Sequence, residues 1–286
     1  MRTYPFTEAR KALWEREGRG TGNDETWNPW LHRGDFNSRG IATIDSLYGD
    51  NGREIHVFSG LERNAWKVYT SSQDAETVQE QVPHDRDLSR RLAREMGIPH
   101  PRDPESQVDI VVTTDFVLTL RTPRGHGRIA RSVKPEHEMN SPNHAEHAEL
   151  ERRLCAHQGI TDFKFLFESS FPQQLLQNVD LLYMSRDLHK QLEPLGYEGS
   201  FAYVSAEVCE HILHANTDAT LANFCLALNE QMKWPPGQAT RTALHAIRWH
   251  KLTADLVGSP ILSQPVRAIA NASRGPNVRQ FKPSVA

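Results

Sequence analysis

The sequence has few cysteines and no long hydrophobic run, and both absences restrict what the protein can do. Its three cysteines, Cys155, Cys209 and Cys225, form no CxxC pair, so we expect neither a disulfide framework nor a zinc knuckle. No apolar stretch approaches the roughly 18 residues of a membrane-spanning helix. The polar start MRTYPFTEARK does not resemble a signal peptide. We therefore expect a cytoplasmic protein with reduced thiols and no membrane partner.

The chain also lacks a strong positive charge. Its formal net charge is −3 at pH 7, so composition alone does not indicate nucleic-acid binding. Basic residues nevertheless collect at one end, because no acidic residue follows Asp255. Residues 258–286 are also rich in Gly, Pro, Ser and Asn, and we expect a basic, partly flexible tail that is either solvated or docks on DNA or a partner. The basic residues of this tail are Arg267, Arg274, Arg279 and Lys282.

The rest of the chain divides near the segment ESSFPQ. Residues 1–168 mix strand and helix patterns and begin with a predicted helix over 7–17, followed by the glycine-rich EGRGTG. No strand precedes these glycines, so they indicate a turn and not a phosphate-binding loop. Residues 169–257 contain several short helical patterns, which are typical of a helix-turn-helix or winged-helix module. We expect a mixed α/β domain and then a helical, winged-helix-like domain. Three basic residues are candidate DNA contacts: Arg19, Arg248 and Lys251.

Two strand-like runs follow one another in the N-terminal part. The runs are QVDIVVTTDFVLTLR (107–121) and GRIARSVKP (127–135), separated by turn-forming residues. A hairpin that pairs Leu120 with Ile129 places Asp115 opposite Lys134, with Cβ atoms about 5 Å apart. Burying a lysine in a sheet is costly unless an anion meets its ammonium. In this register Asp115 supplies that anion, whereas a slip by one residue would put the pair on opposite faces.

An acidic residue beside a lysine on neighbouring strands is typical of metal-dependent nucleases. Phosphodiester hydrolysis needs Mg²⁺, held by oxygen ligands, to neutralise charge on the phosphate and to lower the pKa of the attacking water. A lysine beside the metal can orient that water or stabilise the charge of the transition state. An isolated ion pair explains the same two residues, so the pair alone does not decide between these interpretations.

Two glutamates favour the nuclease interpretation. Glu62 lies in the first turn of a predicted helix that Ser59 caps, close to its apolar stripe. Glu151 lies on the inner face of a predicted helix over 141–159, which leads into another strand-like run over 161–169. The order helix, strand, strand, helix, strand brings four polar residues to one edge of the sheet: Glu62, Asp115, Lys134 and Glu151.

Six short motifs occur in an order that resembles the TnsA family. The motifs are EGRGTG, NPWL, SGLE, VVTTDFVL, SVKP and ELERR, and the resemblance covers about residues 15–168. TnsA proteins are subunits of heteromeric bacterial cut-and-paste transposases. The resemblance implies a restriction-endonuclease-like fold and a Mg²⁺-dependent endonuclease, with Mn²⁺ able to substitute, that cuts the 5′ ends of transposon DNA. It also implies two protein partners, the integrase-type transposase TnsB and the AAA+ ATPase TnsC.

The resemblance assigns roles to individual residues. The catalytic residues of the family fall on Glu62, Asp115 and Lys134, and its helix glutamate falls on Glu151, which would support the metal site. Where the family has glutamine, two residues before the lysine, this chain has Ser132, a shorter and weaker Mg²⁺ ligand. The carbonyl of Val133 is a further ligand that does not depend on the side chain. Two other functions stay open: a stand-alone restriction or repair nuclease, and a DNA- or partner-binding module with a disabled site.

Overall fold

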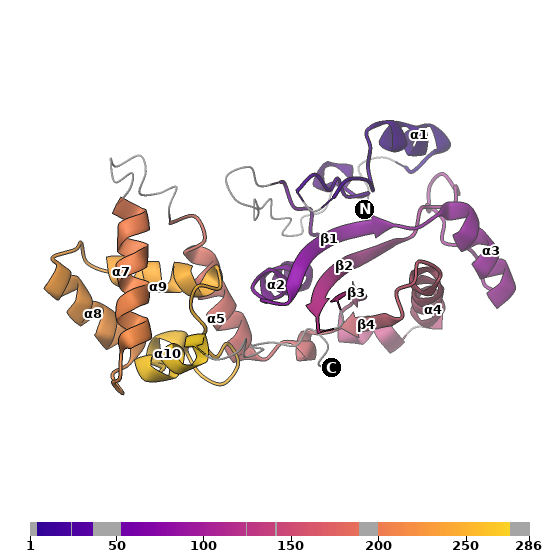
Figure 1. The fold of residues 1–286 in the computed structure, drawn as a ribbon. Coiled ribbons are helices and arrows are strands. Elements are labelled where there is room, and N and C mark those ends of the chain that lie inside the picture. Colours follow the sequence, from indigo (N-terminus) through magenta and orange to yellow (C-terminus); the bar gives the residue numbers. More distant parts are fainter. Residues whose placement is uncertain are drawn as a thin grey trace. The chain divides into compact units, whose positions relative to one another are not determined.

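The computed structural model divides the chain into two compact units. The first unit comprises Met1–Trp66 and Ala75–Ser170, and the second comprises Lys67–Asp74 and Phe171–Ala286. The structure describes residues 5–23, 25–36, 53–123, 125–140, 142–188 and 200–274 (Figure 1).

A four-stranded sheet in the order β1-β2-β3-β4 forms the centre of the first unit. The strands β1, β2 and β3 are antiparallel, whereas β4 is parallel to β3 and is reached through helix α4 (Figure 1). The strands are β1 Ala75–Pro83, β2 Thr113–Thr122, β3 Gly125–Val133 and β4 Asp162–Leu166, and α4 is Pro142–His157. The sequence predicted β2, β3, α4 and β4, and these elements are confirmed. It did not predict β1.

The register of the β2–β3 hairpin differs from the predicted one. Ile129 pairs with Leu118 and not with Leu120. The reason is a tight turn, in which Thr122 already pairs with Gly125, a glycine with φ of +108°. The shift of two residues leaves every side chain on the predicted face because side chains alternate with a period of two. Asp115 therefore falls opposite Ser132 and only diagonally from Lys134.

Helices cover both faces of the sheet. Trp66 of α2 (Gly60–Thr70) packs against Phe116 of β2, with ring centroids 6.4 Å apart. On the other face, Val117 of β2 belongs to a buried cluster that also contains Cys155 of α4. Since Phe116 and Val117 are consecutive, they point to opposite faces of the strand. The sheet is thus covered on both faces.

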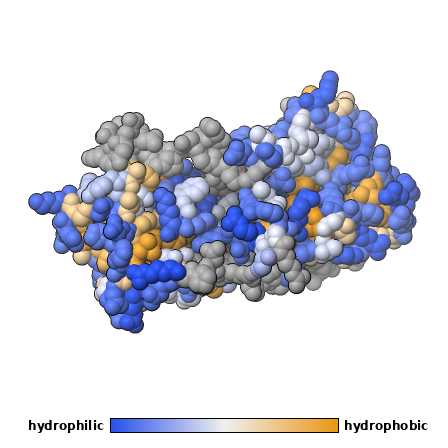
Figure 2. All heavy atoms as spheres, in the orientation of Figure 1, coloured by the Kyte–Doolittle hydropathy of each residue, from blue (hydrophilic) through white to orange (hydrophobic). Residues whose placement is uncertain are grey.

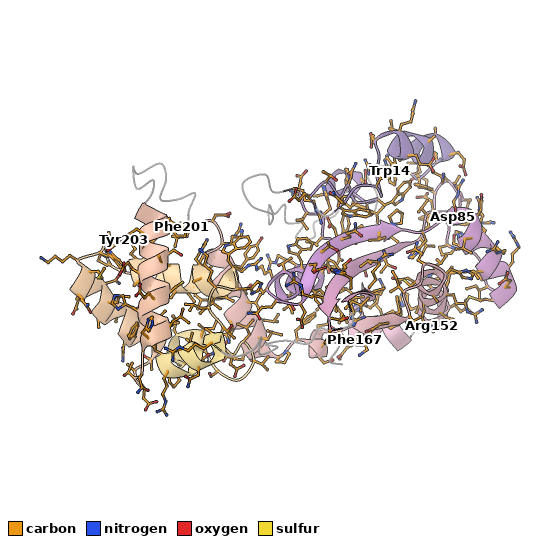
Figure 3. All side chains as sticks on the ribbon, in the orientation of Figure 1. Trp14, Asp85, Arg152, Phe167, Phe201 and Tyr203 are labelled. Carbon is orange, nitrogen blue, oxygen red and sulfur yellow. The ribbon has the colours of Figure 1, made fainter. Side chains whose placement is uncertain are left out.

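Two more helices complete the first unit. Helix α1 (Glu8–Arg16) begins at the N-cap Thr7, as predicted, and buries Trp14 against Phe6 and Trp30 (Figure 3). Helix α3 (Arg86–Met96) was not predicted. Asp85 caps its N-terminus and Gly97 ends it with a left-handed φ of 71° (Figure 3).

The second unit is helical, as the sequence predicted, and its described residues contain no β-strand. Helix α9 begins after the N-cap Gly237, so the two prolines at 235 and 236 precede the helix and do not occupy its first turn as predicted. Among its described residues, the α-helices of this unit are α5 Gln173–Met184, α7 Ser200–His214, α8 Leu221–Met232, α9 Gln238–Arg248 and α10 Val266–Arg274. This unit also contains the short 3₁₀ helix Ile261–Ser263, and those of the first unit are Arg33–Asp35, Glu136–Asn140 and Glu168–Ser170.

The predicted tail from Gly258 begins too early. Residues up to Arg274 belong to the helical unit, because apolar side chains of this segment are fully buried. Asn178 of α5 donates to the carbonyl of Ser259, at 2.8 Å, and so fastens the start of the segment. The buried residues are Ile261, Val266, Ile269 and Ala270. The rest of the predicted tail, residues 275–286, lies outside the described residues.

The surface gives no sign of a membrane-spanning element within the described residues. None of their helices combines the length and the apolar character that a membrane span needs. The face drawn in Figure 2 is predominantly hydrophilic, with hydrophobic residues in separate patches.

Candidate functional site

Glu62 is held at the N-terminus of α2 by a reciprocal cap. Its backbone N–H donates to the Ser59 hydroxyl at 3.0 Å, and that hydroxyl lies 3.1 Å from Glu62 Oε1. The backbone N–H of Phe58 donates to Glu62 Oε2 at 3.0 Å. The side chain is buried, and this burial, followed by the charge of Asp115, raises the pKa of Glu62 above its usual value of 4.5. The cap therefore holds in place a buried carboxylate that is stabilised either by protonation or by a nearby cation.

Asp115 is the centre of the site. Its Oδ2 accepts a hydrogen bond of 2.7 Å from the backbone N–H of Val133 and lies 3.3 Å from the ammonium of Lys134. The Ser132 hydroxyl lies 3.4 Å from the same oxygen. Three consecutive residues at the end of β3 therefore hold one carboxylate oxygen of β2, and the other oxygen faces Glu62 and β1.

Glu151 reaches the site from α4. Ser132 Oγ donates to Glu151 Oε2 at 3.0 Å, whereas the buried Oε1 of Glu151 accepts no hydrogen bond. Burial and the charge of Asp115 raise the pKa of Glu151. A buried carboxylate oxygen without a hydrogen-bond partner is available to a further ligand.

Lys134 has the environment of a permanent cation. Asp115 is the main cause that raises its pKa above the usual 10.5, and Glu151 and Glu62 add to this effect. The side chain is 34% exposed, so its ammonium contacts Asp115 while remaining accessible from outside. Lys134, at the end of β3, thus contacts Asp115 and is also influenced by the charges of Glu151 and Glu62.

Gln81 of β1 is a residue of this cluster that the sequence analysis did not find. Its Nε2 lies 3.4 Å from both Glu62 Oε2 and Asp115 Oδ1. Gln81 is buried and has φ of +49°, a left-handed conformation that costs a non-glycine residue about 1–3 kcal/mol. Such strain concentrates at functional sites, but it is invisible in the sequence, and β1 itself was not predicted.

The cluster can hold a hard cation, with help from more than its carboxylates. Three carboxylates face one ammonium, which leaves an excess of negative charge when all are ionised. Oxygen atoms are the ligands that Mg²⁺ prefers. Among the described residues, however, no three or more His, Cys, Asp or Glu side chains gather closely enough to hold a metal by themselves. Amide, hydroxyl, backbone or water oxygens would have to complete the coordination.

The three predicted DNA contacts differ in accessibility. Arg19 is buried and donates to Asp35 Oδ2 at 2.6 Å. Arg248 is 3% exposed and donates to the carbonyl of Thr70. Lys251 alone of the three is exposed. The structure therefore gives Arg19 and Arg248 roles inside their own units, and leaves Lys251 able to meet a phosphate.

Comparison with known proteins finds a similarity that covers the sheet of the first unit. A family model described as "TnsA-like endonuclease N terminal" matches residues 73–168, a segment that contains all four strands together with Asp115, Lys134 and Glu151. This segment is therefore similar to the N-terminal part of TnsA-like endonucleases. Glu62 precedes the matched segment.

One curated relative extends the similarity beyond this domain. The chain is 28% identical over 227 residues to the "Transposon Tn7 transposition protein TnsA" of Escherichia coli. The aligned region covers 77% of this chain and 76% of the relative, so it also includes part of the helical unit.

Proposed function

We propose that the protein is a Mg²⁺-dependent DNA endonuclease that cuts the 5′ ends of a transposon together with a partner transposase. The partners would be an integrase-type transposase of the TnsB kind and an AAA+ ATPase of the TnsC kind. The match of residues 73–168 to the TnsA-like endonuclease model and the similarity to a transposition protein support this function. The observation that carries the proposal is the buried carboxylate cluster around Lys134.

The residues of the cluster fit a divalent cation. Glu62 and Asp115 would bind it, and Glu151 would contribute the Oε1 atom that accepts no hydrogen bond. The Val133 carbonyl is a further ligand in this proposal. A bound Mg²⁺ would neutralise charge on the scissile phosphate and lower the pKa of the attacking water, and Mn²⁺ would substitute for it.

Lys134 would act as a cation and not as a base. Because Asp115 raises its pKa, the ammonium stays protonated throughout the neutral range. It would therefore donate hydrogen bonds to the attacking water or to a phosphate oxygen. This would orient the nucleophile and stabilise the charge that develops in the transition state.

The main role of Ser132 in this proposal is to link two carboxylates, and not to bind the metal directly. Its hydroxyl lies 3.0 Å from Glu151 Oε2 and 3.4 Å from Asp115 Oδ2, and the residue is fully buried. A single hydroxyl proton cannot serve both oxygens equally, so the shorter contact to Glu151 is the stronger one. The missing glutamine of the family is then compatible with activity if other oxygens complete the metal site.

The test is a strand-cleavage assay on transposon-end DNA with the transposase present. We expect 5′-end cutting with Mg²⁺ and none with a chelator. Asp115→Ala and Lys134→Ala should abolish it. The matched pair Glu151→Gln and Glu149→Gln separates site from surface, because Glu149 lies on the same helix but pairs with the exposed Arg152. We expect a large loss only for Glu151→Gln.

Each other outcome identifies a different function. Normal cutting by Asp115→Ala would remove the site assignment. Efficient cutting by the parent chain without transposase would indicate a stand-alone restriction or repair nuclease. No cutting under any condition, together with stable binding to the transposase, would indicate a partner-binding module with a disabled site.

A further inference from the structure

Gln81 occupies a position between two carboxylates that no assigned role explains. It lies on β1 between Glu80, which pairs with Phe116, and Val82, which pairs with Thr114. It is therefore opposite Asp115, and only 2% of it is exposed. Its carboxamide is thus directed at the site from β1, a strand that contributes no charged group to it.

Both ends of this carboxamide make hydrogen bonds. Nε2 lies 3.4 Å from Glu62 Oε2 and 3.4 Å from Asp115 Oδ1, and Thr113 Oγ1 donates to Gln81 Oε1 at 3.3 Å. The two bonds of Nε2 are long, so neither carboxylate is held tightly by it. The amide nitrogen marks the point where oxygens from α2 and β2 converge.

A cation at that point would repel an amide N–H group and attract an amide oxygen. If the carboxamide turns by 180° about its last torsion, Oε1 joins the oxygens of Glu62 and Asp115. The N–H group then donates to the Thr113 hydroxyl, which can accept as well as donate. This side-chain rotation replaces the hydrogen bonds of the carboxamide with an equivalent set and needs no backbone movement.

The backbone keeps Gln81 in this place. Its φ of +49° is unfavourable for a side chain larger than that of glycine, and its carbonyl accepts a bond of 3.2 Å from Trp30 N–H. Glu80 and Val82 would share one face of a regular strand, but they lie in different environments. Glu80 contacts Arg53, whereas Val82 belongs to the buried cluster with Cys155. A strained conformation at a residue that bridges two carboxylates is consistent with a role in the site.

We propose that Gln81 is a further ligand residue of the divalent-cation site, binding through Oε1 after its carboxamide turns over. This inference rests on the proposed metal dependence. Gln81 would supply a neutral oxygen ligand, which is needed because the acidic side chains of the described residues do not by themselves gather closely enough to hold a metal. Glu62 and Asp115 then form one half of the site with Gln81, and Ser132 connects Asp115 to Glu151 in the other half.

Titration of the full chain with Mn²⁺ tests the inference without any cleavage. Electron paramagnetic resonance counts free Mn²⁺, and the parent and Asp115→Ala are compared first. Gln81→Met removes the oxygen but keeps the length, and Gln81→Glu keeps an oxygen but removes the N–H donor. We expect Gln81→Met to weaken Mn²⁺ binding by about 10- to 100-fold. Gln81→Glu should bind as tightly as the parent or more tightly.

The two substitutions distinguish a ligand from a structural bridge. If Gln81 acts only as a donor between carboxylates, both variants lose that donor and weaken binding alike, which would overturn the inference. Unchanged binding by Gln81→Met would overturn it too. Circular dichroism checks folding, and Gln81→Gly, which suits the left-handed φ, replaces Gln81→Met if that variant does not fold. A parent chain that binds no Mn²⁺ would instead refute the proposed metal dependence, and this inference with it.

Discussion

At the scale of single residues, the site is a set of groups that control one another's charge. Burial, followed by the charge of Asp115, raises the pKa of Glu62 and Glu151, and Asp115 also holds Lys134 protonated. Removal of any one of them therefore changes the protonation of the others, and single substitutions will not be additive. Hydroxyl and amide groups at Ser132 and Gln81 reduce the repulsion without adding charge.

Ser132 gives a prediction at this scale. Its hydrogen bond favours the ionised form of Glu151, so Ser132→Ala should raise the pKa of that carboxyl further. We expect activity to fall by about tenfold or more at neutral pH. The acid limb of the pH–rate profile should move to higher pH. Ser132→Thr keeps the hydroxyl and is the control. A profile for Ser132→Ala that overlays the parent would show that position 132 is only a spacer.

The pH dependence of stability gives a second prediction. In the folded chain Glu62 and Glu151 have pKa values above their usual 4.5, so the folded state binds more protons than the unfolded state above that pH. Their contribution to the free energy of unfolding therefore decreases as the pH rises from 4.5 towards neutrality, by at most about 1.4 kcal/mol per pH unit for each group. Added Mg²⁺ should offset this loss near neutrality and have little effect at pH 5.

Buried histidines oppose this trend and must be separated from it. Burial lowers the pKa of His56, His84 and His250 to about 4, so their contribution to stability increases between pH 4 and 6.5. The quantity to measure is thus the difference in thermal stability between the parent and the double variant Glu62→Gln, Glu151→Gln across pH. A difference that stays constant with pH would contradict the raised pKa values.

At the scale of elements, the sequence predicted those strands whose apolar pattern is regular. The strands β2 and β3 were recognised from Val, Ile and Leu, and α4 from its inner face. The strand β1 was missed because its buried Glu80 pairs with Arg53, at 2.7 Å, where a pattern analysis expects an apolar residue. The left-handed Gln81 also interrupts its alternation. Helix α3 was missed because few of its residues are apolar.

The apolar patterns of the helices and strands also explain which residues of the site could be predicted from the sequence. Glu62, Asp115, Lys134 and Glu151 were found because each is an acidic or basic residue next to an apolar pattern. The hairpin register was two residues off, since it depends on how tightly the chain turns at Thr122 and Gly125. Gln81 carries no charge and lies on the unpredicted strand, so only the fold reveals it.

The glycine-rich turn after α1 yields a prediction about an element. Gly22 has φ of +107°, and a Cβ atom there would lie 2.3 Å from the carbonyl oxygen of Thr26. Gly22→Ala should therefore destabilise the fold by about 1–3 kcal/mol. Gly34→Ala is the control, since a Cβ atom at Gly34 meets no atom within 4 Å. Thermal or urea unfolding measures both. Equal stability of the two variants would show that this turn tolerates a side chain.

At the scale of the whole molecule, the charge distribution argues against independent action on DNA. The net charge is −3, so the chain lacks the positive field that gives DNA-binding proteins their salt-dependent affinity. Arg19 and Arg248 are buried within the fold, which leaves few of the predicted phosphate contacts. If the chain acts as the proposed nuclease, this charge implies that a partner brings it to its substrate, and such dependence would also prevent cutting elsewhere.

The last prediction follows from this dependence. We expect the purified chain to bind transposon-end DNA weakly at physiological salt and not to cut it, with 5′ cleavage appearing only when the transposase is added. Removal of residues 275–286, which include Arg279 and Lys282, should reduce this partner-dependent cleavage. It should leave thermal unfolding unchanged, because the cut falls after the last buried residues of α10. A cut after Gly258 is not an equivalent test, since it would remove the buried Ile261 and Val266. Gel-shift and nicking assays on the parent and the truncated chain decide the matter: tight, sequence-specific binding or efficient cutting by the isolated parent would refute partner dependence.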